Sequence, residues 1–90
     1  MELLQLQYFS EVVRQKSVTK AAQLLHISQP ALSQTIRRLE NELGVKLFEK
    51  SGKGIQLTAK GRRFYTQISF ALKGIQYATD DVRGDNAHVR

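Results

Sequence analysis

Apolar residues recur along the first half of the chain at the three- and four-residue spacing of an α-helix. Leu6, Phe9 and Val13 form the first such stripe. It predicts a helix over residues 3 to 15, because these positions share one helical face. The stripe stops before the sequence RQKS, where polar and basic residues interrupt it. We therefore expect the first helix to end there.

A second, shorter helix is predicted over VTKAAQLLH, residues 18 to 26. Ser17 precedes it and has a side chain that readily caps a helix N-terminus. The apolar positions fall at i, i+3, i+4 and i+7, the pattern of one buried helical face: Val18, Ala21, Ala22 and Leu25. The two small alanines in the middle of this face allow another helix to cross it closely.

The sequence SQPALSQTIRRLENELG, residues 28 to 44, predicts a third helix with signals at both ends. Ser28 is a candidate N-cap, Pro30 fits a first turn that needs no backbone N–H, and Gly44 favours the left-handed conformation that ends helices. The apolar stripe of this helix is Leu32, Ile36, Leu39 and Leu43. Two short helices joined by so few residues predict a helix-turn-helix.

The next segment predicts a β-hairpin. Leu47–Glu49 and Ile55–Leu57 are short β-prone runs on either side of the loop KSGKG. We expect both glycines of this loop to supply the positive φ that a tight hairpin turn requires. Since a two-stranded hairpin is not stable alone, it has to pack against the helices as a wing.

Thr58 is the candidate N-cap of a final helix that the sequence predicts to run to residue 83. Its apolar residues repeat at spacings of four and three, the pattern of a coiled-coil seam: Phe64, Ile68, Ala71, Ile75, Ala78 and Val82. At 1.5 Å per residue this helix is about 35 Å long, more than so small a domain can cover. We therefore expect the seam to pair two copies of the chain as a homodimer.

Together these elements predict a mainly α-helical fold: a winged helix-turn-helix with a three-helix core and a two-stranded wing, followed by a long linker and dimerisation helix. We expect the winged helix-turn-helix domain to span residues 1–58 and the linker helix residues 59–83. The tail, residues 84–90, has no apolar pattern and is typical of a frayed end or the start of a linker.

Charge adds a candidate partner to this fold. The 90 residues include 14 Lys and Arg against eight Asp and Glu, a net charge of +6. No acid occurs between Val12 and Leu39, and the segment from Lys46 to Arg63 holds six basic residues against Glu49 alone. Such an excess favours a polyanion: DNA, RNA or an anionic membrane surface. A basic surface that only aids solubility explains the charge but not its position around a helix-turn-helix.

The third helix presents base-reading types of side chain away from its apolar stripe. Gln29, Ser33 and Gln34 lie in its first turns, which enter the major groove in helix-turn-helix proteins. Glutamine can bind adenine and serine several bases, while Arg37, one turn further on, can reach guanine or a phosphate. Lys53, between the two wing glycines, is placed to approach a minor groove or a phosphate.

Other classes of function find little support in the residues. There is no cysteine, and the two histidines, His26 and His88, fall in a turn and in the tail, so we expect no enzyme, metal site or cofactor. The N-terminus carries Glu2 and Glu11 without a basic segment, and no apolar run approaches the ~18 residues of a membrane span. We therefore expect a cytoplasmic protein with no membrane partner.

Three alternatives remain open from the residues alone. A basic coiled-coil or membrane-surface module accounts for the long helix but not for the helix-turn-helix and wing before it. An RNA-binding domain needs exposed aromatic residues on which bases stack, and none is evident. Another kind of winged-helix repressor differs mainly in its last helix, which here leads out of the domain.

The sequence LQLQYFSEVVRQKSVTKAAQLLHISQPALSQTIRRLENELGVKLFEKSGKGIQLTAKG closely resembles the N-terminal DNA-binding domain of LysR-type transcriptional regulators. The alanine pair, the run LGVKLFEK and the sequence LTAKG carry the likeness, which extends to about residue 83. It implies a bacterial regulator that binds double-stranded promoter DNA, dimerises through the linker helix and commonly forms tetramers. It also implies a larger C-terminal domain for a small-molecule inducer, so the 90 residues are expected to be a fragment.

The resemblance also implies individual site residues. The family's base-contacting positions fall on Gln29, Pro30, Ser33, Gln34 and, in the wing, Lys53; its phosphate-contacting positions match Thr19, Lys20, Ser28, Arg37 and Ser51. Many relatives have arginine at the wing position, and some have it at position 34. Lysine lacks the planar fork of arginine, and glutamine shifts preference away from guanine. The DNA sequence preferred by relatives therefore does not carry over.

Overall fold

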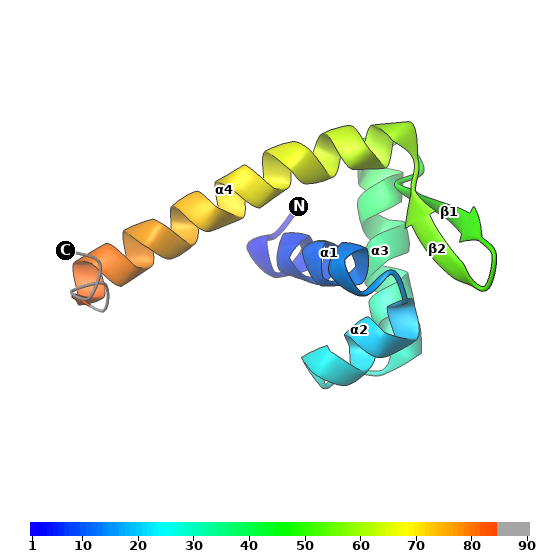
Figure 1. The fold of residues 1–90 in the computed structure, drawn as a ribbon, viewed down its shortest axis with the longest axis horizontal. Coiled ribbons are helices and arrows are strands. Elements are labelled where there is room, and N and C mark those ends of the chain that lie inside the picture. Colours follow the sequence, from blue (N-terminus) through cyan, green and yellow to red (C-terminus); the bar gives the residue numbers. More distant parts are fainter. Residues whose placement is uncertain (85–90) are drawn as a thin grey trace.

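The computed structural model describes residues 1–84, which form four helices and one hairpin (Figure 1). In chain order these are α1 (Leu3–Gln15), α2 (Val18–Leu25), α3 (Gln29–Leu43), β1 (Phe48–Ser51), β2 (Gly54–Leu57) and α4 (Ala59–Arg83). This order confirms the predicted winged helix-turn-helix with a long final helix. Most of the predicted tail, residues 85–90, lies outside the described part of the chain.

Local signals set the ends of the helices. The side chains of Ser17, Ser28 and Thr58 accept hydrogen bonds of 3.0–3.2 Å from the backbone N–H groups of Lys20, Ala31 and Gly61. The helices end at residues in the left-handed conformation, with φ between 56° and 74°: Lys16, His26, Gly44 and Gly84. Each cap satisfies backbone groups that the helix leaves unpaired, which explains why the helices end at these residues. The predicted helix boundaries are confirmed to within a residue.

The core joins all elements around one aromatic side chain. Phe9 of α1 is fully buried, and its ring centroid lies 5.5 Å from that of Phe48 in β1 and 5.4 Å from that of Phe64 in α4. Ala21 and Ala22 of α2 are buried as well, which lets α1, α2 and α3 pack against one another. The remaining buried apolar residues are Val12, Leu32, Ile36, Leu39 and Leu47.

The wing differs in detail from the prediction. Pairing runs from Phe48 opposite Leu57 to Ser51 opposite Gly54, so both strands extend closer to the turn than expected. Of the two loop glycines only Gly52 has a positive φ, 59°, which fits a two-residue turn with glycine first. The expectation for Gly54 was wrong. Its missing side chain serves close packing, since a Cβ there would lie 3.1 Å from the carbonyl oxygen of Lys16.

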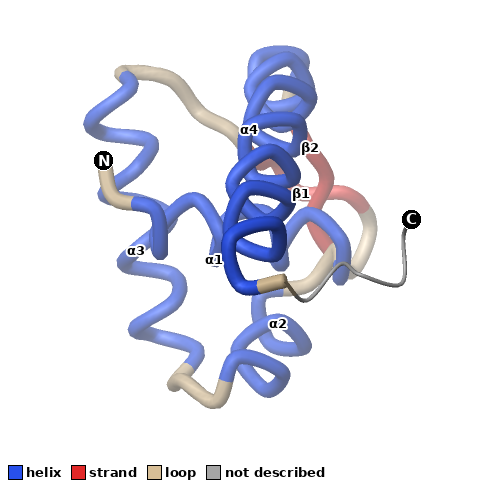
Figure 2. The backbone as a smooth tube through the Cα atoms, turned by 90° about the vertical axis from the view of Figure 1, so that its left-hand side faces the viewer, coloured by secondary structure: helices blue, strands red, loops and turns tan. Residues whose placement is uncertain are grey.

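Helix α4 belongs to the core only through its first half. Its 25 residues cross α1 and then extend beyond the rest of the domain (Figure 1). Figure 2 shows α4 nearly along its axis, with α2 at the opposite end of the molecule. Within residues 1–84, no helix is both long and apolar enough to cross a membrane.

Gly61 marks the closest approach between α4 and the segment before the wing. A Cβ atom there would lie 2.1 Å from the carbonyl oxygen of Leu47, so Gly61→Ala has to displace backbone. We expect it to lower the free energy of unfolding by about 1–3 kcal/mol. The matched control is Gly74→Ala, which meets open space and should stabilise α4 by up to ~1 kcal/mol. Urea denaturation of both variants measures the contrast, and equal stabilities would contradict it.

Glu11 gives the fold a predictable response to acid. Its carboxylate accepts hydrogen bonds from Arg14 at 2.6 Å and Gln15 at 2.8 Å, and these, the Arg14 bond first, lower its pKa below the ordinary 4.5. Because this pKa is lower in the folded than in the unfolded chain, ionised Glu11 stabilises the fold at pH values above the ordinary pKa. This stabilisation disappears as the pH falls through the folded-state pKa. Glu11→Gln should therefore reduce the free energy of unfolding at pH 7, and this reduction should shrink as the pH falls below 4.5. A difference independent of pH in urea titrations would refute this cause.

Candidate nucleic-acid interface

The turn between α2 and α3 fixes where α3, the candidate recognition helix, begins. The backbone N–H of Ile27 donates to the carbonyl of Ala22 at 3.1 Å, and Ser28 then caps α3. On α3 the side chains of Leu32, Ile36 and Leu39 are buried. The opposite side of its first turns therefore faces solvent.

Three of the four base-contact candidates on α3 are exposed: Gln29, Pro30 and Gln34. Ser33 is half-buried, and its Oγ accepts a 2.9 Å hydrogen bond from Nε2 of Gln29. This pairing leaves the Ser33 O–H free to donate outward, together with the Oε1 of Gln29 as an acceptor. The sequence places the two residues four apart on one face, but the bond between them is a finding of the structure.

Candidate phosphate contacts surround the turn between α2 and α3. Thr19, Lys20 and Ser28 are all exposed there. The Oγ of Ser28 already accepts from the N–H of Ala31, so its own proton is available to an acceptor such as a phosphate oxygen. Arg37 is exposed two turns further along α3.

The wing brings the remaining candidates to the same side of the domain. Ser51 and Lys53 are exposed at its tip, which points away from α4 and toward the end that holds α2 and the first turn of α3 (Figure 1). Ser51 ends β1, and Lys53 follows Gly52 in the two-residue turn. A rod-shaped partner along this side can thus meet α3 and the wing together.

Few carboxylates compensate the basic residues of this side. Within residues 1–84 three ion pairs form: the Met1 amine with Glu42, Arg14 with Glu11, and Lys46 with Glu40. In that part of the chain none of them involves Lys20, Arg37 or Lys53. The uncompensated charge favours a polyanion at this surface.

One buried acid escaped the sequence analysis as a candidate. Glu40 is only 7% exposed and accepts hydrogen bonds from backbone N–H groups beside the wing. It lies four residues after Ile36, so the two share a side of α3. That position beside an apolar stripe was the available signal for a buried carboxylate.

The predicted seam of α4 divides into two parts. Phe64 and Ile68 are half-buried within the chain, and Phe64 already packs on Phe9. Further along, Ala71, Ile75, Ala78 and Val82 are exposed, Val82 to 83%. The outer half of α4 therefore presents an apolar stripe that this chain does not cover.

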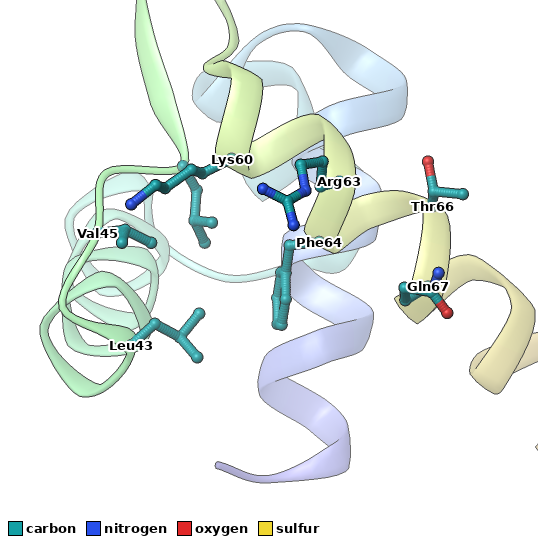
Figure 3. Close-up of a pocket in the computed structure, with 8 residues that line it drawn as sticks. Leu43, Val45, Lys60, Arg63, Phe64, Thr66 and Gln67 are labelled. Atoms are coloured by element: carbon teal, nitrogen blue, oxygen red, sulfur yellow. The ribbon is translucent and has the colours of Figure 1, made fainter.

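A groove lies beside that seam, between the C-terminal end of α3 and the first turns of α4 (Figure 3). Its volume is about 570 Å³. Leu43, Val45 and Phe64 give it an apolar floor, and Lys60 and Arg63 a cationic rim.

These features define a class of protein: a winged helix-turn-helix domain built to contact double-stranded DNA. The model of the bacterial regulatory helix-turn-helix protein, lysR family, matches residues 3–62. The chain belongs to this family, and its helix-turn-helix and wing are the DNA-binding domain of a LysR-type transcriptional regulator.

Individual relatives agree with this assignment. The chain is 45% identical over 84 residues to the HTH-type transcriptional regulator PcaQ of Agrobacterium fabrum, covering 93% of this chain and 27% of PcaQ. It is 44% identical to the regulator BudR of Klebsiella aerogenes, covering 93% of this chain and 59% of BudR. These relatives are transcriptional regulators, not enzymes. The chain spans about a quarter of the length of PcaQ.

Solved structures match the fold closely. The BenM_DBD/catB site 1 DNA complex has a TM-score of 0.87 at 38% identity, with 92% of each chain covered. The CbnR_DBD-DNA complex has a TM-score of 0.83 at 37% identity, covering 96% of this chain and 99% of the other. Membership of this family favours DNA over the RNA-binding and membrane-surface alternatives.

Proposed function

We propose that this chain reads a specific sequence of promoter DNA with the first turns of α3. The observation that carries the proposal is the position of three polar side chains, the exposed Gln29 and Gln34 and the half-buried Ser33, in the first turns of a helix anchored by its apolar stripe. Two neighbouring structures, BenM_DBD and CbnR_DBD, are DNA complexes, which supports the same type of partner here.

The chemistry of the side chains assigns each a role in this proposal. Glutamine binds adenine through a donor and an acceptor, and the Ser33 hydroxyl donates to a base acceptor in the major groove. Pro30 offers an apolar surface to a thymine methyl group. Lys53 contacts the minor groove or the backbone beside it, as a point charge.

The phosphate contacts position the domain without selecting a sequence. We assign them to exposed hydroxyl and cationic groups around the reading helix and the wing: Thr19, Lys20, Ser28, Arg37 and Ser51. Each neutralised phosphate makes the fall of log affinity with log salt steeper by about 0.9. Binding is therefore expected to weaken steeply as salt rises.

We infer that two chains pair through α4 in antiparallel orientation. The six seam positions are symmetric about residue 73, so antiparallel helices bring Phe64 opposite Val82, Ile68 opposite Ala78 and Ala71 opposite Ile75. Each layer then combines a larger with a smaller side chain, which favours close packing. Two reading helices related by a twofold axis bind two half-sites separated by whole turns of DNA.

Charge supports this orientation. Lys60 and Arg63 lie at the start of α4, whereas Asp80 and Asp81 lie near its end. A parallel pair brings like charges together, but an antiparallel pair brings the acidic end of one helix toward the basic rim of the partner's groove. The exposed Val82 of one chain then lies near the apolar floor of that groove.

The wider role follows from the relatives. We infer that the chain acts in the cytoplasm of a bacterium as the DNA-binding part of a regulator of transcription. From the family resemblance we assign the binding of a small-molecule inducer and assembly into tetramers to a C-terminal domain. Relatives such as PcaQ have room for one, since this chain covers 27% of PcaQ.

Base reading and phosphate contact predict different outcomes for two substitutions. Gln34→Ala should change the sequences selected from random duplex DNA and cost about 1–3 kcal/mol on the preferred site. Lys53→Ala should weaken binding to all sequences alike and lower the salt slope by about 1. Gln7→Ala and Lys73→Ala, at exposed positions of α1 and α4, are matched controls. An unchanged preference for Gln34→Ala would remove it as a reader.

Pairing through the seam predicts a second contrast, on opposite sides of α4. Ile75→Asp places a charge in the proposed interface and should shift the protein to a monomer in analytical ultracentrifugation. Tyr77→Asp is the control, because Tyr77 is 69% exposed and lies away from the seam. A dimer that survives Ile75→Asp but not Tyr77→Asp would place the interface on the other face.

A further inference from the structure

The short segment from Lys46 to Phe48 connects α3 to the wing and is held from both sides. On its N–H side, Oε2 of Glu40 accepts hydrogen bonds from Leu47 at 2.7 Å and from Phe48 at 3.3 Å. Glu40 belongs to α3, and its other oxygen lies 3.9 Å from Nζ of Lys46. One side chain of the reading helix therefore binds the first residue of the wing.

On the carbonyl side the same segment is tied to α4. Thr58 donates from its Oγ1 to the carbonyl of Lys46 at 2.7 Å and from its backbone N–H to the carbonyl of Leu47 at 2.9 Å. Thr58 is also the N-cap of α4, since its Oγ1 accepts from the N–H of Gly61. We call Glu40, Thr58 and the segment between them, residues 46–48, the clasp.

The clasp adds directional bonds to a wing that otherwise rests on apolar packing, in which Phe48, Ile55 and Leu57 lie against the core. A two-stranded hairpin is not stable alone, and every residue of β1 and β2 is exposed or half-buried. The packing of Phe48 on Phe9 holds the base of the wing in the core. The bonds from Glu40 are charge-assisted and therefore stronger and more directional than neutral ones.

We propose that Glu40 is a positioning residue for DNA recognition. By fixing the start of the wing to α3, it sets the distance and angle at which Lys53 meets the duplex that α3 reads. The proposal rests on the proposed function, in which Lys53 contacts DNA. It adds a residue that touches no DNA itself: Glu40 lies seven residues beyond Ser33, about two turns further along α3, and is buried against the start of the wing.

The positioning role and simple electrostatics predict changes of opposite sign in DNA affinity when the charge of Glu40 is removed. Replacing Glu40 with a neutral residue raises the net charge of a DNA-binding protein by one. That change alone strengthens attraction to phosphates. A positioning role instead predicts weaker binding and a lower salt slope, because Lys53 is no longer held against the duplex.

The experiment compares Glu40→Ala and Glu40→Gln with Glu49→Gln, each with and without Lys53→Ala, by measuring duplex affinity over a series of salt concentrations. Glu49 is exposed on the wing, so its variant removes the same charge without touching the clasp. Glu40→Ala should lower the salt slope by about 1, and adding Lys53→Ala should change it little further. Glu40→Gln keeps an acceptor oxygen and should restore most of the Lys53 contribution.

Folding is controlled in two ways. Circular dichroism sets a temperature at which every variant is folded, and Ile36→Val supplies a destabilised α3 with an intact clasp. Ile36→Val should leave the effect of Lys53→Ala unchanged. If Glu40→Ala does not fold, Glu40→Leu takes its place in the same comparison, because leucine fills the buried site without an acceptor oxygen. A smaller effect of Lys53→Ala in that background supports the proposal, and an undiminished effect overturns it.

The other outcomes distinguish failure of the positioning role of Glu40 from failure of the contact between Lys53 and DNA. If Glu40→Ala binds more tightly, as Glu49→Gln should, or if Lys53→Ala has its full effect in the Glu40→Ala background, the positioning role is wrong while the proposed function stands. If Lys53→Ala has no effect in the unchanged chain, the wing contact fails, and the role of Glu40 fails with it.

Discussion

The packing of Phe9 is the interaction on which the rest of the structure depends. Its fully buried ring lies 5.4–6.2 Å from the rings of Phe48, Phe64 and Tyr65, so one side chain of α1 joins the wing and α4 to the helical core. Aromatic residues bury more surface than any others, which matters in a chain of 90 residues that can bury only a modest share of its surface. Loss of this contact removes the packing site that the hairpin and α4 share in the core.

The reading surface follows from that core by simple geometry. The buried stripe of α3 fixes which side of the helix faces outward, and the Ser28 cap fixes where its first turn lies. The groups that contact DNA in our proposal are consequently accessible to DNA while the helix that carries them is held by the core. Glu40 extends the same logic to the wing, because a buried carboxylate with backbone donors is a more rigid link than an exposed ion pair.

Helix α4 combines two environments in one element. Gly61 and Phe64 pack within the chain, whereas Ile75 and Val82 lie beyond the domain and stay exposed. An isolated apolar stripe of this length is unfavourable in water, and a second copy of the same helix covers it in the proposed dimer. The groove beside Phe64 places that interface close to the segment that joins α3 to the wing.

The sequence by itself determined the helices, their ends and the family, because caps, left-handed residues and apolar spacing act within a few residues of the chain. It also indicated the exposed candidates on α3. Only the tertiary structure decided which glycine turns the wing, why Gly54 and Gly61 carry no side chain, and that Gln29 bonds to Ser33. It also decided that Phe64 belongs to the core and that Glu40 binds the backbone of the wing. Most of these depend on atoms far apart in sequence, and the Gln29–Ser33 bond on a choice of side-chain rotamers, neither of which local patterns encode.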